Sequence, residues 1–261
     1  MGKYLFFDVD GTLFDPEIHI PDSTKEGFRR LRDNGHHLFI STGRTKCLLF
    51  SELLDLGFEG MICGSGTYME HEGRELFRYE MPVDETVELM NTFHDNDMYI
   101  FAEGTELLFC DEYKPVAAPD LVRFIFNTDT TDFIRSSADP LLRVSKISGF
   151  SKTDDRDVSD VFRLLSEKYT CVMHGKNYIE TIKPGFSKGQ AILELSRRLG
   201  FDMNDTYAFG DSMNDLDMLR TVKYGVAMGN GNPDLLRAVS LHTDDFRNDG
   251  LYKGLKMMEL I

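Results

Sequence analysis

The chain has few cysteines and no long apolar run. The cysteines lie far apart, form no CxxC pair and have no histidine at metal-ligand spacing. We therefore interpret all four as reduced and mostly buried: Cys47, Cys63, Cys110 and Cys171. No basic start leads into an apolar signal core, and no apolar run approaches the ~18 residues that a membrane span needs. These absences predict a cytoplasmic protein.

Positive charge is also scarce. The 261 residues include 29 lysines and arginines against 44 aspartates and glutamates, which gives a formal net charge of -15. Nucleic acids and anionic membrane surfaces need a basic footprint, so the charge argues against both as partners. The length allows one large domain or two small ones. We find no internal repeat and no low-complexity segment.

Several short apolar runs end in small or acidic residues. Because they are apolar on both faces, they are typical of buried parallel strands. They cover residues 4–10, 37–42, 60–66, 207–211 and 224–228. Helix-like stretches lie between them, at residues 51–57, 188–200 and 214–220, and the second is closed by Gly200. This alternation predicts an α/β fold with a doubly wound sheet.

The pattern changes from about Val83 to Pro184. Two amphipathic, helix-like stretches and five strand-like stretches with partial alternation indicate an α+β insert with an antiparallel sheet. The helix-like stretches are residues 85–97 and 156–168, and the strand-like ones are residues 98–103, 106–112, 143–150, 169–175 and 178–184. Prolines near both ends mark boundaries. We predict a core of residues 1–82 and 184–261 interrupted by a cap of residues 83–183.

Two acids follow the first apolar run directly, in KYLFFDVDGTLFD. Residues two apart on a strand point the same way, so Asp8 and Asp10 should meet near its carboxyl end, where Gly11 lets the backbone turn sharply. Ligands bind at this end of the strands in open α/β sheets. The alternative is that Asp10 and Gly11 form only a turn.

A second group of acids stands in GDSMND, residues 210–215. Its spacing places Asp211, Asn214 and Asp215 on one helical face, although Asp211 could also be a helix cap. Converging carboxylates without histidine or thiolate favour a hard cation with oxygen ligands. Because Mg²⁺ binds to a few carboxylates together with substrate phosphate, it is the predicted cofactor.

Two further segments suggest an anion site. STGR, residues 41–44, ends the second strand where a helix could begin, so its backbone N–H groups could face an anion, or its arginine could simply be solvated. Lys188 opens a predicted helix, where a positive charge opposes the helix dipole. A phosphate or a carboxylate should therefore offset that charge.

Four pieces in this order resemble the haloacid dehalogenase superfamily of phosphohydrolases: DVDGT (8–12), STGR (41–44), SKG (187–189) and GDSMND (210–215). Their order and the place of the insert are similar to the Cof-like branch, and the likeness extends to residues 226–239 and 248–255. The resemblance implies a Rossmann-like parallel-sheet core with an inserted α+β cap of the C2B type, which closes over the active site and contacts the leaving group.

The resemblance also implies roles for single residues. Asp8 is the nucleophile that forms an aspartyl-phosphate, Asp10 protonates the leaving alcohol and then activates water, and Lys188 completes the catalytic set. The implied Mg²⁺ ligands are Asp8, the backbone carbonyl of Asp10, Asp211 and, through water, Asp215. The implied phosphate-binding residues are Thr42, Gly43, Lys188 and Asn214, with Arg44 placed to reach substrate or neighbouring acids. Phosphoryl transfer needs these charges, because a carboxylate that attacks a phosphate dianion meets repulsion.

The chain departs from the family pattern at two positions. Ser65 precedes Gly66 where the family often has Asn-Gly, and Ser41 replaces the usual alanine. Residues 229–232, GNGN, are interpreted as a strand-to-helix turn, with a backbone phosphate nest as the alternative. In the cap, Tyr178, Glu180 and Thr181 are candidates for facing the cleft, and ordinary sheet surface is the alternative.

These expectations describe a Mg²⁺-dependent phosphatase of small phosphorylated metabolites, with hexose and pentose phosphates foremost. A sugar phosphomutase is the first alternative, but it should need basic cap residues to retain a bisphosphate, and the insert has only scattered lysine and arginine. A non-catalytic phosphosugar-binding regulator is the second, and the intact acids and lysine count against it. The expected partner is the substrate alone, with the protein a monomer or a small homo-oligomer.

Overall fold

The computed structural model describes residues 2–15, 17, 19–111, 132–153 and 156–261, which form two compact units. The first contains Met1–Arg44, Leu49–Arg78 and Phe186–Ile261, and the second contains Thr45–Leu48 and Tyr79–Gly185. The predicted cap of residues 83–183 lies within the second unit, which also takes in the short segment Thr45–Leu48. That each unit is a domain in its own right stays a prediction.

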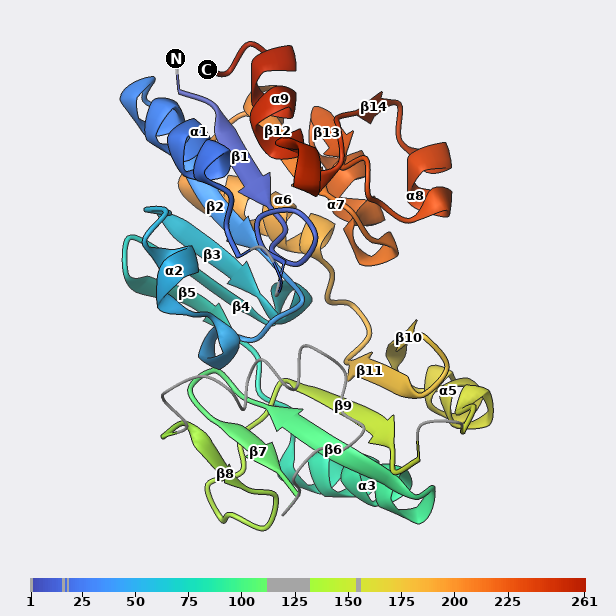
Figure 1. Cartoon of the computed structure of the whole chain (residues 1–261). Helices are drawn as coiled ribbons and strands as arrows, with labels where there is room; N and C mark the ends of the chain where they lie inside the picture. Colours follow the sequence, from blue (N-terminus) through green and yellow to red (C-terminus); the bar gives the residue numbers. More distant parts are fainter. Residues whose placement is uncertain (1, 16, 18, 112–131, 154–155) are drawn as a thin grey trace. The chain divides into compact units, whose positions relative to one another are not determined.

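The first unit contains an eight-stranded sheet among its described residues (Figure 1). Five neighbouring pairs are parallel, including β1 with both β2 and β12, while β3, β4 and β5 pair antiparallel. The order is β14 (Leu241–His242), β13 (Tyr224–Ala227), β12 (Thr206–Gly210), β1 (Tyr4–Phe7), β2 (His37–Ser41), β3 (Gly60–Cys63), β4 (Tyr68–His71) and β5 (Arg74–Arg78). The predicted α/β fold class is confirmed, and the β4–β5 hairpin is an addition to it.

Helices cover both faces of this sheet. Phe6 and Phe39 point to one face, where they pack with Ile192 of α6 and Leu219 of α7, whereas Phe7 on the other face lies 4.7 Å from the ring of Phe28 in α1. The helices are α1 (Asp22–Asp33), α2 (Ser51–Leu54), α6 (Lys188–Leu199), α7 (Leu216–Thr221), α8 (Pro233–Ala238) and α9 (Gly250–Met257). Helix α6 ends at the predicted glycine, since Gly200 has a φ of 77°.

The second unit has a six-stranded sheet, which is antiparallel except where β7 meets β8. One face packs against α3 (Val83–Asp95) and α5 (Ser159–Ser166) through an apolar cluster that includes Phe93, Ile100 and Ile147. The strand order is β10 (Thr170–His174), β11 (Tyr178–Ile182), β9 (Lys146–Ser151), β6 (Met98–Glu103), β7 (Leu108–Cys110) and β8 (Ile134–Ser136). The predicted strand of residues 106–112 runs partly outside the described residues.

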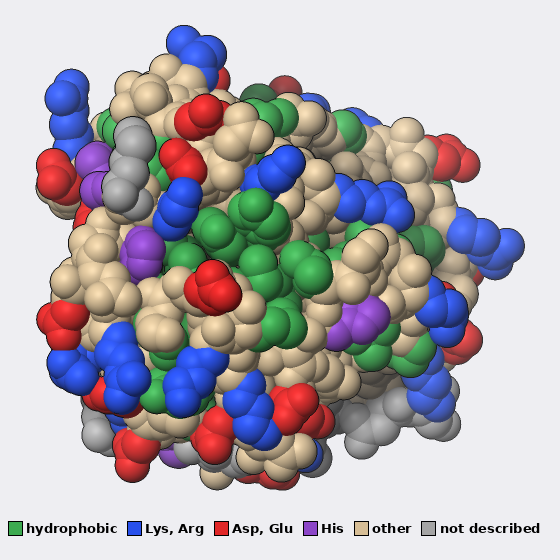
Figure 2. Space-filling model, turned by 90° about the horizontal axis from the view of Figure 1, so that it is seen from above, with side chains coloured by type: hydrophobic (Ala, Val, Ile, Leu, Met, Phe, Trp, Pro, Cys, Tyr) green, Lys and Arg blue, Asp and Glu red, His purple; other side chains and the backbone are tan. Residues whose placement is uncertain are grey.

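The distribution of surface charge and the absence of a long apolar helix among the described residues agree with the amino-acid composition. Acidic and basic side chains are interspersed on the face shown in Figure 2, around a group of hydrophobic side chains, so the excess of acids forms no single-sign field there. Among the helices that the structure describes, none combines the length and the apolar character that crossing a bilayer requires.

Candidate active site

The turn after β1 places two acids at the carboxyl end of the sheet. Asp8 is 5% exposed, and its N–H donates to the carbonyl of Phe209 in β12 at 3.0 Å. The turn closes when the N–H groups of Leu13 and Phe14 donate to the carbonyl of Val9. Gly11 has a φ of 78°, and a Cβ there would lie 2.3 Å from Asp211 Oδ2, so both the conformation and the space require glycine.

The loop after β12 carries the second group of acids. Asp215 is fully buried and its Oδ2 accepts the N–H groups of Asp211 and Ser212, each at 3.0 Å. Ser212, and not Asp211, is the N-cap of the short 3₁₀ turn Met213–Asp215. Asp211 therefore does not cap a helix, which excludes the alternative interpretation of that residue.

Lys188 joins the two groups of acids. Its ammonium is completely buried and lies 2.6 Å from Asp8 Oδ1 and 2.5 Å from Asp215 Oδ1. Burial opposes the charged ammonium, but Asp215 and Asp8 outweigh burial and raise the pKa of Lys188. Lys188 is therefore a fixed positive charge beside the nucleophile candidate.

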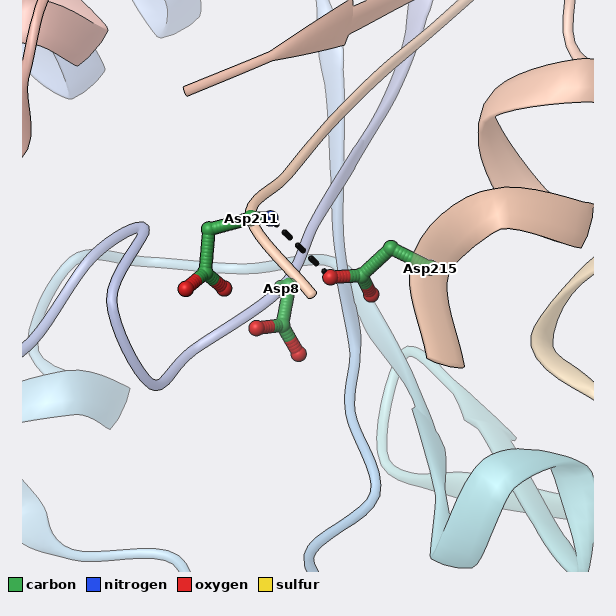
Figure 3. A group of neighbouring side chains, drawn as sticks. All are labelled: Asp8, Asp211 and Asp215. Carbon is green, nitrogen blue, oxygen red and sulfur yellow. Dashed lines mark hydrogen bonds between the residues drawn. The ribbon is translucent and has the colours of Figure 1, made fainter. Parts of the chain in front are cut away.

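Asp8, Asp211 and Asp215 form a cluster in which one carboxylate oxygen of each lies within 4.8 Å of the corresponding oxygens of the other two (Figure 3). Burial, together with the charges of neighbouring acids, raises the pKa of Asp8 to about 7 and that of Asp211 to about 9. Asp211 Oδ1 is buried and has no hydrogen-bond partner among the described residues. Three ionised acids would carry more negative charge than Lys188 neutralises, which favours either protons or a cation at the site, and a buried oxygen of Asp211 is left for a cation.

These residues fit a Mg²⁺ ion. All the donors are oxygens, which a hard cation prefers, and there is neither histidine nor thiolate in the cluster. Both oxygens of Asp215 already accept hydrogen bonds, from Lys188 and from backbone N–H groups. That leaves Asp8 and Asp211 as the side chains better placed to touch a metal directly.

Arg44 is buried against the turn after β1. Its Nε and Nη2 donate to Asp10 Oδ2 and Oδ1 at 2.8 and 2.6 Å, and the guanidinium lies 5.7 and 5.4 Å from the ring centres of Phe14 and Phe50. Of the expected contacts for Arg44, the structure shows the one with a neighbouring acid, and the solvated arginine is wrong. The expected helix start is also wrong, because a 3₁₀ turn, Lys46–Leu48, follows instead.

Two polar side chains lie beside Gly43. A Cβ on Gly43 would stand 3.5 Å from Asn214 Nδ2 and 3.7 Å from Ser65 Oγ, so both side chains lie close to this backbone. Ser65 has a φ of 54°, a left-handed conformation in which asparagine is enriched, and its N–H donates to the Thr42 carbonyl. The left-handed turn at Ser65 was predictable from the Asn-Gly that the resemblance implies for this place, because asparagine is enriched in that conformation.

The remaining predictions concern β11 and residues 229–232. Tyr178 and Glu180 share one face of β11, but Thr181 points to the opposite face and donates its hydroxyl to the Ile147 carbonyl at 2.6 Å. Thr181 therefore cannot share a surface with the other two. Residues 229–232 are indeed a strand-to-helix turn, which ends where Asn232 caps α8.

Comparisons with known proteins agree with this arrangement. A family model described as haloacid dehalogenase-like hydrolase matches residues 5–255. The putative phosphatase YkrA of Bacillus subtilis is 27% identical over 100% of this chain and 99% of its own. An HMP-PP phosphatase of Escherichia coli is 30% identical over 90% of this chain and 87% of its own. The solved structure of the HAD subclass IIB sugar phosphatase BT4131 is 25% identical, with a TM-score of 0.81 over 99% of this chain and 100% of that one.

Proposed function

The chain belongs to the haloacid dehalogenase-like hydrolases and is a phosphatase, and from that premise we propose the reaction in full. It hydrolyses small phosphorylated metabolites, with hexose and pentose phosphates foremost, in a Mg²⁺-dependent reaction that passes through an aspartyl-phosphate. The observation that carries the proposal is the buried Lys188, which bridges Asp8 and Asp215 beside the unpaired oxygen of Asp211.

In the first half-reaction, a carboxylate oxygen of Asp8 bonds to phosphorus while the bond from phosphorus to the leaving oxygen breaks. Lys188 holds the Oδ1 of Asp8 and thereby directs the other oxygen of that carboxylate. Asp8, Asp211 and the Asp10 carbonyl would hold Mg²⁺, whose charge would reduce the repulsion between carboxylate and phosphate. The phosphoryl oxygens are bound by Thr42, Gly43, Lys188 and Asn214.

Asp10 moves the protons in both half-reactions. It gives a proton to the leaving oxygen, and it later takes one from the water that attacks the phosphorus of the aspartyl-phosphate and releases phosphate. In the structure both oxygens of Asp10 are paired with Arg44, an arrangement that suits the ionised carboxylate. Asp10 must therefore turn away from Arg44 to carry its proton, and its half-exposed side chain leaves room for that movement.

The substrate class rests on relatives that differ among themselves. One solved structure is named as a sugar phosphatase and one curated relative as an HMP-PP phosphatase. We propose sugar phosphates because the structural likeness to the sugar phosphatase extends over nearly the whole of both chains. A cytoplasmic location and a monomeric or small oligomeric state stay predictions.

Phosphate release from a panel of sugar, nucleotide and cofactor phosphates tests the proposal. We expect release with Mg²⁺, loss of release with a chelator, and a fall of about 10³-fold or more in Asp8→Asn, which lacks the nucleophile. The matched control is Asp205→Asn, which removes a carboxylate paired with Lys3 at the opposite end of the neighbouring strand.

Two results would count against the proposal. Release by a folded Asp8→Asn variant within tenfold of wild type would exclude Asp8 as the nucleophile. If the wild type released no phosphate from any compound of the panel, the phosphomutase or the regulator would be favoured instead. A bisphosphate-retention assay and a binding assay would distinguish those two.

A further inference from the structure

Asn230 makes two long-range contacts from the turn that follows β13. Its Nδ2 donates to the carbonyl of Gly11 at 2.8 Å, and its Oδ1 accepts the N–H of Phe246 at 2.9 Å. The side chain is exposed, yet both ends of its amide are bonded to backbone groups of distant segments. A residue that served only to turn the chain would need neither bond.

The Gly11 carbonyl belongs to the turn that carries the nucleophile. Gly11 follows Asp10 directly, and its own N–H donates to the Phe14 carbonyl at 2.9 Å. On the other side, Gly11 leaves no space for a side chain against Asp211 Oδ2. A shift of this turn would therefore change the distance between the Asp8–Asp10 segment and the Asp211 carboxylate.

The same short segment also holds the acidic loop. The N–H of Asn232 donates to the carbonyl of Asp211 at 2.7 Å, and the N–H of Met228 donates to the carbonyl of Gly210 at 2.9 Å. A Cβ on Gly231 would lie 3.0 Å from the Asp211 carbonyl, so the segment packs closely against that loop. Residues 228–232 thus contact the loops after β1 and after β12 at the same time.

We propose that Asn230 is a positioning residue for the cation site, a role that rests on the proposed function. It ties the turn after β1 to the segment that holds Asp211, and so it sets the spacing of the oxygens that would surround Mg²⁺. Groups that hold a metal's ligands in place are worth roughly 10- to 100-fold in metal affinity or activity. Asn230 acts one residue further out, through Gly11, the neighbour of the implied ligand Asp10. Asn230 itself touches neither metal nor substrate.

The test measures Mg²⁺ binding to the full chain by titration calorimetry, without substrate. Asn230→Ala loses both bonds, while Asn230→Asp keeps an acceptor for the Phe246 N–H and loses the donor to Gly11. We expect the dissociation constant for Mg²⁺ to rise about tenfold in both variants. The aspartate variant is the more telling, because its added negative charge would by itself strengthen cation binding.

Asn232→Ala is the matched control. It lies in the same turn and loses the cap of α8, where Asn232 Oδ1 accepts the N–H of Asp234 at 2.8 Å, but it keeps the backbone bond to Asp211. We expect it to lower the thermal unfolding temperature and to leave Mg²⁺ binding within twofold of wild type. If Asn232→Ala weakened Mg²⁺ binding as much as the Asn230 variants do, general destabilisation of the turn would explain all three results and the proposal would be overturned.

The other outcomes are also decisive. Mg²⁺ affinity within twofold of wild type in both Asn230 variants would overturn the role of Asn230, and so would a wild type that binds no Mg²⁺. Because calorimetry needs no turnover, a wild type that binds Mg²⁺ but hydrolyses nothing on the panel would defeat the proposed reaction and leave the positioning role standing.

Discussion

Lys188 stands at the start of α6, where a positive charge opposes the helix dipole. Two carboxylates, those of Asp8 and Asp215, contact its ammonium, and Asp217 accepts the N–H of Gly189 next to it at 2.9 Å. The sequence predicts that some anion offsets this lysine. It does not say which, because a phosphate and a carboxylate would serve equally well. The structure shows carboxylates, and so the lysine is in place before any substrate binds.

The buried hydroxyl of Ser41 should lower the stability of the protein. Its Oγ is buried and has no hydrogen-bond partner among the described residues, where the family usually has alanine. An unpaired buried hydroxyl costs free energy, so Ser41→Ala should raise the free energy of unfolding by about 1 kcal/mol and leave kcat unchanged. Urea unfolding and phosphate release measure the two effects.

Ser148→Ala is the control for Ser41. Ser148 is equally buried, but its hydroxyl donates to Glu103 Oε1 at 2.9 Å, so its removal should lower the free energy of unfolding. A loss of stability in Ser41→Ala as well would mean that the Ser41 hydroxyl is satisfied in solution.

At the scale of elements, the sheet of the second unit buries charge on one face. Glu103 of β6, Lys146 of β9 and Glu180 of β11 lie together, with Lys146 Nζ 2.8 Å from Glu180 and 3.6 Å from Glu103. Burial alone would raise the pKa of Glu180, but Lys146 and His174 outweigh it and lower that pKa to about 2. For Glu103 burial prevails and raises the pKa. Lys146 thus offers a positive charge to both buried acids, Glu103 and Glu180, on this face of the sheet.

Lys146→Met should therefore destabilise the protein strongly. Removing the lysine leaves Glu103 buried without its cation and leaves Glu180 with His174 as its remaining basic neighbour at 3.5 Å. Breaking a buried pair costs about 3 to 5 kcal/mol. The control is Lys168→Met in the same unit, because its pair with Glu88 is exposed and should contribute little to stability. Urea unfolding that shows equal, small losses in both variants would contradict the buried-pair argument.

Elements with strong local patterns could be predicted, and those that depend on distant partners could not. The strands β1, β2, β3, β12 and β13 are continuous apolar runs, and α6 carries its own cap residues, so periodicity and caps are enough to find them. The hairpin β4–β5 has half-exposed strands with weak alternation. It exists because β4 pairs with the edge of β3, a contact that no local pattern records.

At the scale of the whole molecule, the proximity of the candidate site residues was predictable, because they stand at strand ends and at a helix start that the fold must bring together. Asp8, Lys188 and Asp211 each follow or precede an element with a clear pattern. The assignment of Thr45–Leu48 to the second unit was not predictable. It depends on Thr45 Oγ1 donating to Glu103 at 3.3 Å and Cys47 Sγ donating to the Gly104 carbonyl at 3.3 Å, across more than fifty residues of chain.

The acid cluster should make the stability of the whole molecule depend on pH and, if it binds Mg²⁺ as proposed, on Mg²⁺. The pKa values of Asp8 and Asp211, about 7 and about 9, lie above the value near 3.9 of an unfolded aspartate. Between about pH 4 and about pH 9 the metal-free folded chain therefore binds more protons than the unfolded chain, so these groups reduce stability as pH rises across that range. The proposed Mg²⁺ would replace those protons, so it should raise the thermal unfolding temperature more at pH 9 than at pH 6.

Thermal unfolding between about pH 6 and pH 9, with chelator and with Mg²⁺, measures this linkage. Asp211→Asn should weaken the fall in stability across that range and remove most of the gain from Mg²⁺, since the amide neither ionises nor binds the cation strongly. Asp205→Asn should keep the wild-type behaviour, because its carboxylate pairs with Lys3 away from the cluster. The general repulsion of an acidic chain is common to all three proteins and cancels in the comparison. A metal-free wild type that gains stability from pH 6 to pH 9, or an equal Mg²⁺ effect in Asp211→Asn, would contradict the assignment of the buried charge to this cluster.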